Sequence, residues 1–141
     1  MIKKKPRSLI IHLKRFKIDP NTLRYQKLGH RIPFPAELRI ESALDEGHGA
    51  EDKSVLYHLK GIVVHLGQGY AYGHYFALIN SRGRWIRFDD TSVDAVDEKY
   101  IRALFGSPSA SSQSSSSSFS IMGGENANWP TAYMLLYDSE E

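Results

Sequence analysis

Two runs of residues that favour β-strands, 73–80 and 84–90, flank a short polar segment that ends at Gly83. Runs of this kind, separated by turn-forming residues, predict a β-hairpin. This feature constrains the fold more than any other in the chain, because a hairpin brings defined residues of two strands face to face. A shift of one residue in the pairing would turn every side chain to the opposite face of the sheet.

The hairpin brings a histidine close to two aspartates. If Ser81-Arg82 forms the loop, the numbers of paired residues sum to 163 and His74 lies opposite Asp89. Directly opposed residues have Cβ atoms about 4.5–5.5 Å apart, which lets a carboxylate hydrogen-bond an imidazole. A three-residue loop with a bulge would place Asp90 there instead. The spacing alone leaves both aspartates open, and an exposed cross-strand ion pair without a chemical role is the alternative to a site.

A carboxylate beside a histidine fixes the tautomer and orientation of the ring and stabilises its protonated form. The hairpin can therefore supply the base and the orienting residue of a nucleophilic triad. The other histidines lie in strand or loop patterns and have no zinc-ligand spacing, so we expect no metal site in this chain.

The rest of the chain also has mainly strand patterns. Further strands are predicted where branched and aromatic residues run between turn signals, over 9–18, 22–27, 55–66 and 131–137. One helix is predicted over 97–105, with Asp97 as its N-cap and Gly106 just beyond its end. This order predicts an α+β fold, a predominantly antiparallel sheet with one short helix.

Length and composition bound the domain organisation. The chain has 141 residues, 41% of them hydrophobic and 24% charged, which is typical of a single globular domain over residues 1–141. Residues 107–120 contain ten serines, and such a segment cannot bury enough apolar surface to order itself. We therefore expect a disordered insertion at 107–125. No apolar stretch has the length needed to cross a bilayer, so we expect no membrane partner.

Cysteine is absent from the sequence, which removes disulfides, thiolate zinc sites and a cysteine nucleophile from this chain. The charge is uneven, because residues 1–40 carry a net charge of +9 and residues 41–141 a net charge of −7. A basic front half is one feature of nucleic-acid-binding proteins. No interleaved basic and aromatic motif accompanies it, so nothing apart from this charge supports a nucleic-acid partner.

A longer motif surrounds the candidate histidine. The ubiquitin-specific proteases have a histidine box that resembles the segment Tyr57-His-Leu-Lys-Gly-Ile-Val-Val-His-Leu-Gly67, followed after five residues by Gly73-His-Tyr75. Nine defined positions over nineteen residues agree. The segments 9–16, 85–90 and 132–137 also resemble successive segments of that family, in the same order. The resemblance covers nearly the whole chain apart from the serine insertion, and it implies the palm half of a papain-like fold.

The resemblance implies a role for each member of the hairpin site. These proteases are cysteine enzymes that remove ubiquitin from proteins. His74 matches their general base, which acts on a cysteine thiol, and Asp89 matches the residue that orients this histidine. That match selects the pairing sum of 163. Asp90 matches a position with a supporting role.

The resemblance also implies a binding site for the C-terminal tail of ubiquitin. Gly67 and Gly69 belong to a loop that arches over the tail, and Gly73 and Tyr75 flank the channel for its terminal glycines. Ubiquitin and ubiquitinated proteins are thus the implied partners. No cofactor is implied for this chain, because the family's zinc site lies in its fingers, outside the matched region.

The family's nucleophile has no counterpart in the sequence. The cysteine box, the oxyanion-hole asparagine or glutamine, the helical thumb and the fingers all precede the matched region. A thiolate is required for this chemistry, and a serine in a disordered segment is not held within reach of a base.

We therefore expect the C-terminal part of a deubiquitinase catalytic domain, inactive by itself, with the missing thumb and fingers as a further partner. Such a half-enzyme is expected to expose an apolar face and to associate through it. The alternative is a catalytically inactive ubiquitin-binding or scaffold protein. The absence of targeting signals and disulfides favours the cytoplasm or the nucleus.

Overall fold

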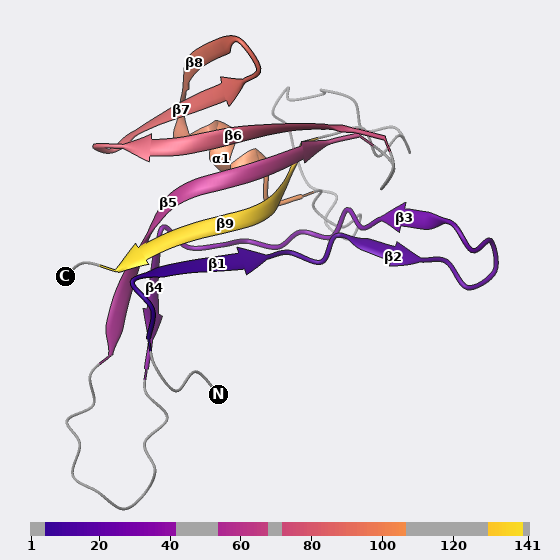
Figure 1. Cartoon of the computed structure of the whole chain (residues 1–141), viewed down its shortest axis with the longest axis horizontal. Coiled ribbons are helices and arrows are strands. Elements are labelled where there is room, and N and C mark those ends of the chain that lie inside the picture. Colours follow the sequence, from indigo (N-terminus) through magenta and orange to yellow (C-terminus); the bar gives the residue numbers. More distant parts are fainter. Residues whose placement is uncertain (1–4, 42–53, 68–71, 107–129, 140–141) are drawn as a thin grey trace, which may run out of the picture.

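The structure of the chain, a computed structural model, describes residues 5–41, 54–67, 72–106 and 130–139 (Figure 1). The strands are β1 (Ser8–His12), β2 (Phe16–Ile18), β3 (Tyr25–Lys27), β4 (Glu37–Ile40), β5 (Val55–Leu66), β6 (His74–Ser81), β7 (Arg84–Asp89), β8 (Ser92–Val96) and β9 (Thr131–Ser139), and the helix is α1 (Glu98–Ala103). The predicted insertion at 107–125 lies outside the described residues.

Seven strands form one antiparallel sheet in the order β1-β9-β5-β6-β7-β8, with β4 also paired to β5. Strands β2 and β3 form a separate two-stranded sheet, which extends to one side of the large sheet (Figure 1). The predicted α+β class, mostly antiparallel sheet with one short helix, is confirmed. Within the described ranges, no helix has the length and apolar character needed to cross a membrane.

Strand β5 lies at the centre of the sheet and carries a bulge. Its register against β9 shifts after Leu59, so that Lys60 is an extra residue in the strand. The shift changes which residues face the core: Leu59 before the bulge is buried, and so are Ile62 and Val64 after it. The large apolar side chains that face the core therefore change from odd to even numbers within one strand.

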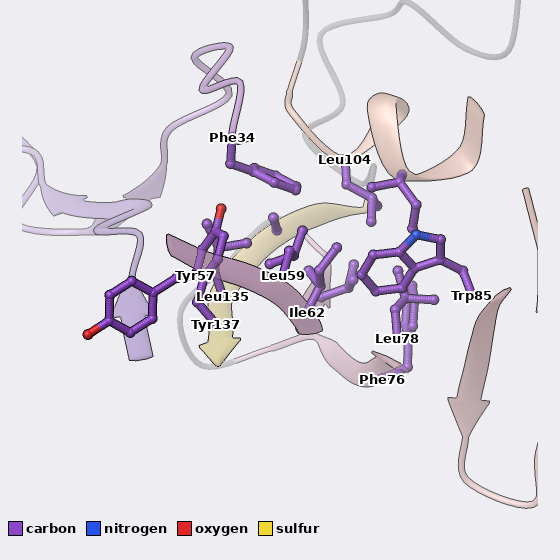
Figure 2. Packing of buried hydrophobic residues seen from close by; sticks show 13 residues of the cluster. Phe34, Tyr57, Leu59, Ile62, Phe76, Leu78, Trp85, Leu104, Leu135 and Tyr137 are labelled. Carbon is purple, nitrogen blue, oxygen red and sulfur yellow. The ribbon is translucent and has the colours of Figure 1, made fainter. Parts of the chain in front are cut away.

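The hydrophobic core lies between one face of the large sheet and a cover made by α1 and the segment that contains Phe34 (Figure 2). Ile62, Leu78 and Trp85 come from three neighbouring strands and share this core with Leu104, which follows the helix. Full burial of each large apolar side chain contributes about 1.5–3 kcal/mol. This packing holds the β6–β7 hairpin against the rest of the sheet.

Helix α1 begins where the sequence predicts it. The Asp97 side chain accepts a hydrogen bond from the N–H of Tyr100 at 2.9 Å, which confirms the N-cap. The helix ends at Ala103, and Gly106 follows with a φ of +112°. A left-handed backbone of this kind is accessible to glycine at little cost.

The single strand predicted over 9–18 is wrong, because the structure divides it into β1 and β2. Between them Arg15 turns inward and is only 1% exposed. Its guanidinium donates to the main-chain carbonyls of Phe105 at 2.9 Å, Ala132 at 3.3 Å and His30. These three acceptors compensate the burial of the cation, and the strand pairing stops where the arginine enters. The predicted partner at 22–27 is present as β3, paired with β2.

Candidate active site

The β6–β7 hairpin exists as predicted, but its register differs. Ser81 pairs with Arg84 and Ala77 with Phe88, so paired residue numbers sum to 165. Both the preferred sum of 163 and the alternative of 164 are wrong. The physical reason is a two-residue loop in which Arg82 and Gly83 have φ values of 52° and 81°. Two successive positive φ angles match the twist of the paired strands, which favours this loop.

The difference of two residues preserves the face on which each side chain lies. His74 on β6 therefore shares a face with Arg87 and Asp89 on β7, although His74 and Asp89 are not register partners. Diagonal neighbours on a sheet are about 7–8 Å apart, within reach of long and aromatic side chains. The imidazole of His74 spans this separation, and its Nε2 forms a hydrogen bond with Oδ1 of Asp89. The predicted pairing of this histidine with Asp89 is present despite the different register.

The hydrogen bond shifts the pKa values of both groups. It raises the pKa of His74 above its ordinary value, and the negative charges of Asp89 and Asp90 act in the same direction. The pKa of Asp89 is lowered, first by the hydrogen bond with His74 and then by the one with Arg87. A charged carboxylate accepts, so Nε2 is the protonated nitrogen of a neutral ring. The remaining nitrogen, Nδ1, then carries the lone pair that can accept a proton.

Arg87 is a member of this site that the sequence interpretation missed. Its Nη2 donates a hydrogen bond to Oδ2 of Asp89. Its guanidinium carbon lies 4.4 Å from the centre of the Phe76 ring, a cation–π arrangement. The signal was available in the sequence, because residues two apart on a strand share a face and Arg87 precedes Asp89 by two.

Asp90 lies in the turn between β7 and β8, with a φ of 50°. His74, Asp89 and Asp90 bring ligand-type atoms within 4.8 Å of one another. However, Nε2 of the histidine and both oxygens of Asp89 already form hydrogen bonds within the protein. This donor set therefore fits a hydrogen-bonded dyad with a nearby second carboxylate better than it fits a metal ion.

Two of the three glycines predicted to bind a ubiquitin tail, Gly67 and Gly73, lie at the tightly packed ends of β5 and β6. Gly67 has a φ of +133°, and a Cβ at Gly73 would lie 2.1 Å from Nε2 of His65, so neither position accepts a side chain without movement. The buried Lys27 donates from Nζ to the carbonyls of His65 at 3.1 Å and of Gly67 at 3.0 Å. Burial, followed by the charge of Arg15, lowers the pKa of Lys27 to about 8. The structure thus fixes both ends of the loop that precedes His74.

The other predicted tail-binding residues are Gly69 and Tyr75. Gly69 lies outside the described residues. Tyr75 follows His74 on β6, so its side chain points to the other face of the sheet, where it is 47% exposed. Its ring centre lies 4.8 Å from that of His65 and 5.6 Å from that of Tyr133.

Comparison with known proteins identifies the family. A family model described as ubiquitin carboxyl-terminal hydrolase matches residues 1–137. The chain belongs to the ubiquitin carboxyl-terminal hydrolase family. Ubiquitin carboxyl-terminal hydrolase 4 of Arabidopsis thaliana is 41% identical over 138 residues, which cover 98% of the chain. The ubiquitin carboxyl-terminal hydrolase creB of Emericella nidulans is 45% identical over 106 residues, which cover 74% of the chain and 13% of creB. The resemblance inferred from the histidine box is therefore confirmed.

Solved structures of the same family have the same fold. In a yeast SAGA DUB module, one chain superimposes with a TM-score of 0.62 and 26% identity, covering 96% of this chain and 24% of that one. In an Ubp8/Sgf11/Sus1/Sgf73 DUB module bound to ubiquitin aldehyde, the TM-score is 0.65 at 24% identity, covering 96% of this chain and 25% of that one; this likeness shows the fold alone. The chain spans 33% of the Arabidopsis relative, or about a quarter of the solved chains.

Proposed function

We propose that this chain carries the general base and the orienting carboxylate of a thiol-dependent deubiquitinase, which hydrolyses the peptide or isopeptide bond after the last glycine of ubiquitin. The hydrogen bond between Nε2 of His74 and Oδ1 of Asp89 carries the proposal. Ubiquitin is the proposed partner, because members of the family are named for it and a structural relative has been solved with ubiquitin aldehyde. The cysteine nucleophile comes from polypeptide outside this chain, which contains none.

The geometry assigns a task to each nitrogen of the imidazole. Nε2 donates to Asp89, so Nδ1 accepts the proton of the cysteine thiol, and the thiolate attacks the carbonyl carbon of the glycine. The imidazolium then gives this proton to the leaving amine as the C–N bond breaks and a thioester remains. Water attacks the thioester with His74 again as base, which frees the thiol and the carboxylate of ubiquitin. Asp89 keeps the ring in the required tautomer and stabilises its charged form.

A chimera tests this proposal directly. Residues 1–137 replace the matched segment of the Arabidopsis relative, whose 41% identity makes the exchange practicable. Hydrolysis of a fluorogenic amide of ubiquitin is then measured for the chimera and for its variants. We expect activity in the chimera and a loss of roughly 10²–10⁴-fold with His74→Ala, the range for removing a general base. His12→Ala is the matched control, because His12 is an exposed histidine at the end of β1.

The same experiment separates the proposal from its alternative. An active chimera that keeps its rate in His74→Ala refutes the proposed role of His74. A chimera that binds ubiquitin without turnover, while the parent Arabidopsis enzyme is active in the same assay, supports the inactive ubiquitin-binding protein instead. The isolated chain is expected to show no turnover in either case, since a thiolate is required.

A further inference from the structure

The carboxylate of Asp89 is shared between two partners. One oxygen, Oδ1, meets Nε2 of His74, and the other, Oδ2, accepts from Nη2 of Arg87. Asp89 is the last residue of β7, directly before the turn at Asp90. A hydrogen bond on one oxygen still lets the carboxylate turn about its Cβ–Cγ bond, so the bond to the partly exposed ring does not by itself define its direction. A second hydrogen bond on the opposite oxygen, from Arg87, fixes that direction.

Arg87 is itself held in place. Its guanidinium stacks on Phe76, which is 5% exposed, and its strand position is paired with Leu78 in the core. Its side chain is 31% exposed, against 41% for His74 and 15% for Asp89. The two partners of Asp89 thus differ. His74 is the more exposed partner, and Arg87 is the partner anchored on the core.

We propose that Arg87 is a positioning residue, which holds Oδ2 of Asp89 so that Oδ1 stays aimed at Nε2 of His74. This inference rests on the proposed role of the His74–Asp89 pair. A lysine would keep the positive charge but not the planar group that stacks on a ring while it donates to a carboxylate. The arginine therefore serves through its shape as well as its charge.

Removal of Arg87 should change the pKa of His74 in one direction if Arg87 positions Asp89, and in the opposite direction if Arg87 acts only as a charge. A cation near His74 lowers the pKa of the imidazole, whereas the hydrogen bond from Asp89 raises it. If Arg87 acted only as a charge, its removal would raise the pKa of His74. If Arg87 positions Asp89, its removal weakens the hydrogen bond and lowers that pKa. The other titratable groups near this cluster, Asp90 on the following turn and Tyr100 on α1, are unchanged in both cases.

The test measures the pKa of His74 in the full chain by deuterium exchange at the C2 position of histidine, read by mass spectrometry at micromolar concentration. Arg87→Met is compared with the unmodified chain and with Asp89→Asn, which defines the full loss of the hydrogen bond. Arg84→Met is the matched control, since Arg84 is an exposed arginine of β7 on the opposite face. His12, His30 and His58 are internal references in every sample.

We expect Arg87→Met to lower the pKa of His74 by at least half of the drop seen in Asp89→Asn, Arg87→Lys to give a smaller drop, and Arg84→Met to give none. A rise or no change in Arg87→Met would overturn the inference, provided that the reference histidines are unaffected. A rise or drop in the references as well would show a general loss of structure and would equally count against a positioning role. No nucleophile is needed, so failure of the chimera to hydrolyse ubiquitin would refute the proposed function without altering this result.

Discussion

His74 and Asp89 meet diagonally across β6 and β7, two residues away from direct opposition. Extending the observed register by one pair sets Asp89 opposite Phe76, whose ring supports the guanidinium of Arg87. With direct opposition, the pairing sum of 163, Arg87 would face Phe76 across the strands instead. In the observed register, Arg87 pairs with Leu78 and reaches Phe76 diagonally, while its Nη2 donates to the same carboxylate.

The two aspartates are expected to differ strongly in effect. In the active chimera, Asp89→Asn removes the charge that orients and stabilises the imidazolium, and we expect kcat/KM to fall by roughly 10²–10⁴-fold. Asp90→Asn is expected to lower it less than about tenfold, because only a longer-range charge is lost. Asparagine also tolerates the φ of 50° at this position. Equal losses in the two variants would contradict the assignment of Asp89 as the orienting residue.

The dyad also makes stability depend on pH. The pKa of Asp89 lies below its usual 3.8 in the folded chain and that of His74 lies above its usual 6.5. The contribution of Asp89 is present above pH 3.8 and is lost as pH falls through its folded pKa. The contribution of His74 is complete below pH 6.5 and is lost as pH rises through its folded pKa.

The free energy of unfolding of the chain relative to Asp89→Asn is therefore expected to be largest between pH 3.8 and 6.5. Urea unfolding followed by tryptophan fluorescence, at about pH 5.5 and about pH 8.5, measures this difference. We expect the variant to lose less stability at the higher pH. A difference that does not change between the two conditions would mean that the histidine is not paired with this carboxylate.

Most of the site could be predicted from the sequence, but the register of β6 against β7 could not. The hairpin, the shared face of His74 and Asp89, and the family followed from strand patterns, turn residues and one motif. The pairing sum depended on which residues form the loop, and Arg82 gives no local signal for a positive φ. Asparagine or aspartate before Gly83 would have given one. The family resemblance selected the aspartate that hydrogen-bonds His74, but not the observed pairing of the strands.

The break in the strand predicted over 9–18 has a different cause. Arg15 interrupts the predicted strand because carbonyls from residues 30, 105 and 132 surround it in the fold. These acceptors are 15, 90 and 117 residues away in the chain, so no local pattern encodes them. The bulge at Lys60 is of the same kind, since its position depends on the pairing of β5 with Leu136 and Tyr137 of β9, far along the chain. Local preference predicts strands, whereas tertiary partners decide where they break.

The contact between Gly73 and His65 predicts a severe effect of a single methyl group. A Cβ at Gly73 would lie 2.1 Å from Nε2 of His65, so Gly73→Ala must displace a ring that is 1% exposed. Overpacking of this kind costs about 1–3 kcal/mol. Gly83→Ala is the comparison, because a Cβ there meets nothing within 4 Å and only the φ of 81° opposes it. We expect about 1 kcal/mol for that variant, the lower end of the cost of a left-handed backbone for a residue with a Cβ. Urea unfolding that ranks Gly83→Ala as the more damaging change would contradict this packing.

Lys27 is expected to stabilise the chain more at high pH than at neutral pH. Its pKa is about 8 in the folded chain and 10.5 in an exposed lysine, so the unfolded state binds more protons between these values. Stability attributable to this group therefore rises from pH 8 to 10.5, as the buried amine loses its charge. Lys27→Met cannot titrate, and the stability of the chain relative to this variant should increase over the same interval. A constant difference in urea unfolding would show that the pKa of this amine is not lowered in the fold.

The second face of the large sheet predicts self-association of the isolated chain. A shallow apolar depression of about 190 Å³ is lined there by side chains of four strands, including Ile10, Val63, Ile79 and Met134. Ile10 is 64% exposed and Ile79 is 39% exposed, and contiguous exposed apolar surface favours association.

We expect the apparent mass in sedimentation velocity to increase with concentration, and Ile79→Thr to reduce this increase because it keeps a β-branched side chain while adding a hydroxyl. Ile18→Thr, a change of the same kind on the separate sheet, is the control. A chain that sediments as a monomer at every concentration, or equal effects of the two variants, would show that this face does not drive association.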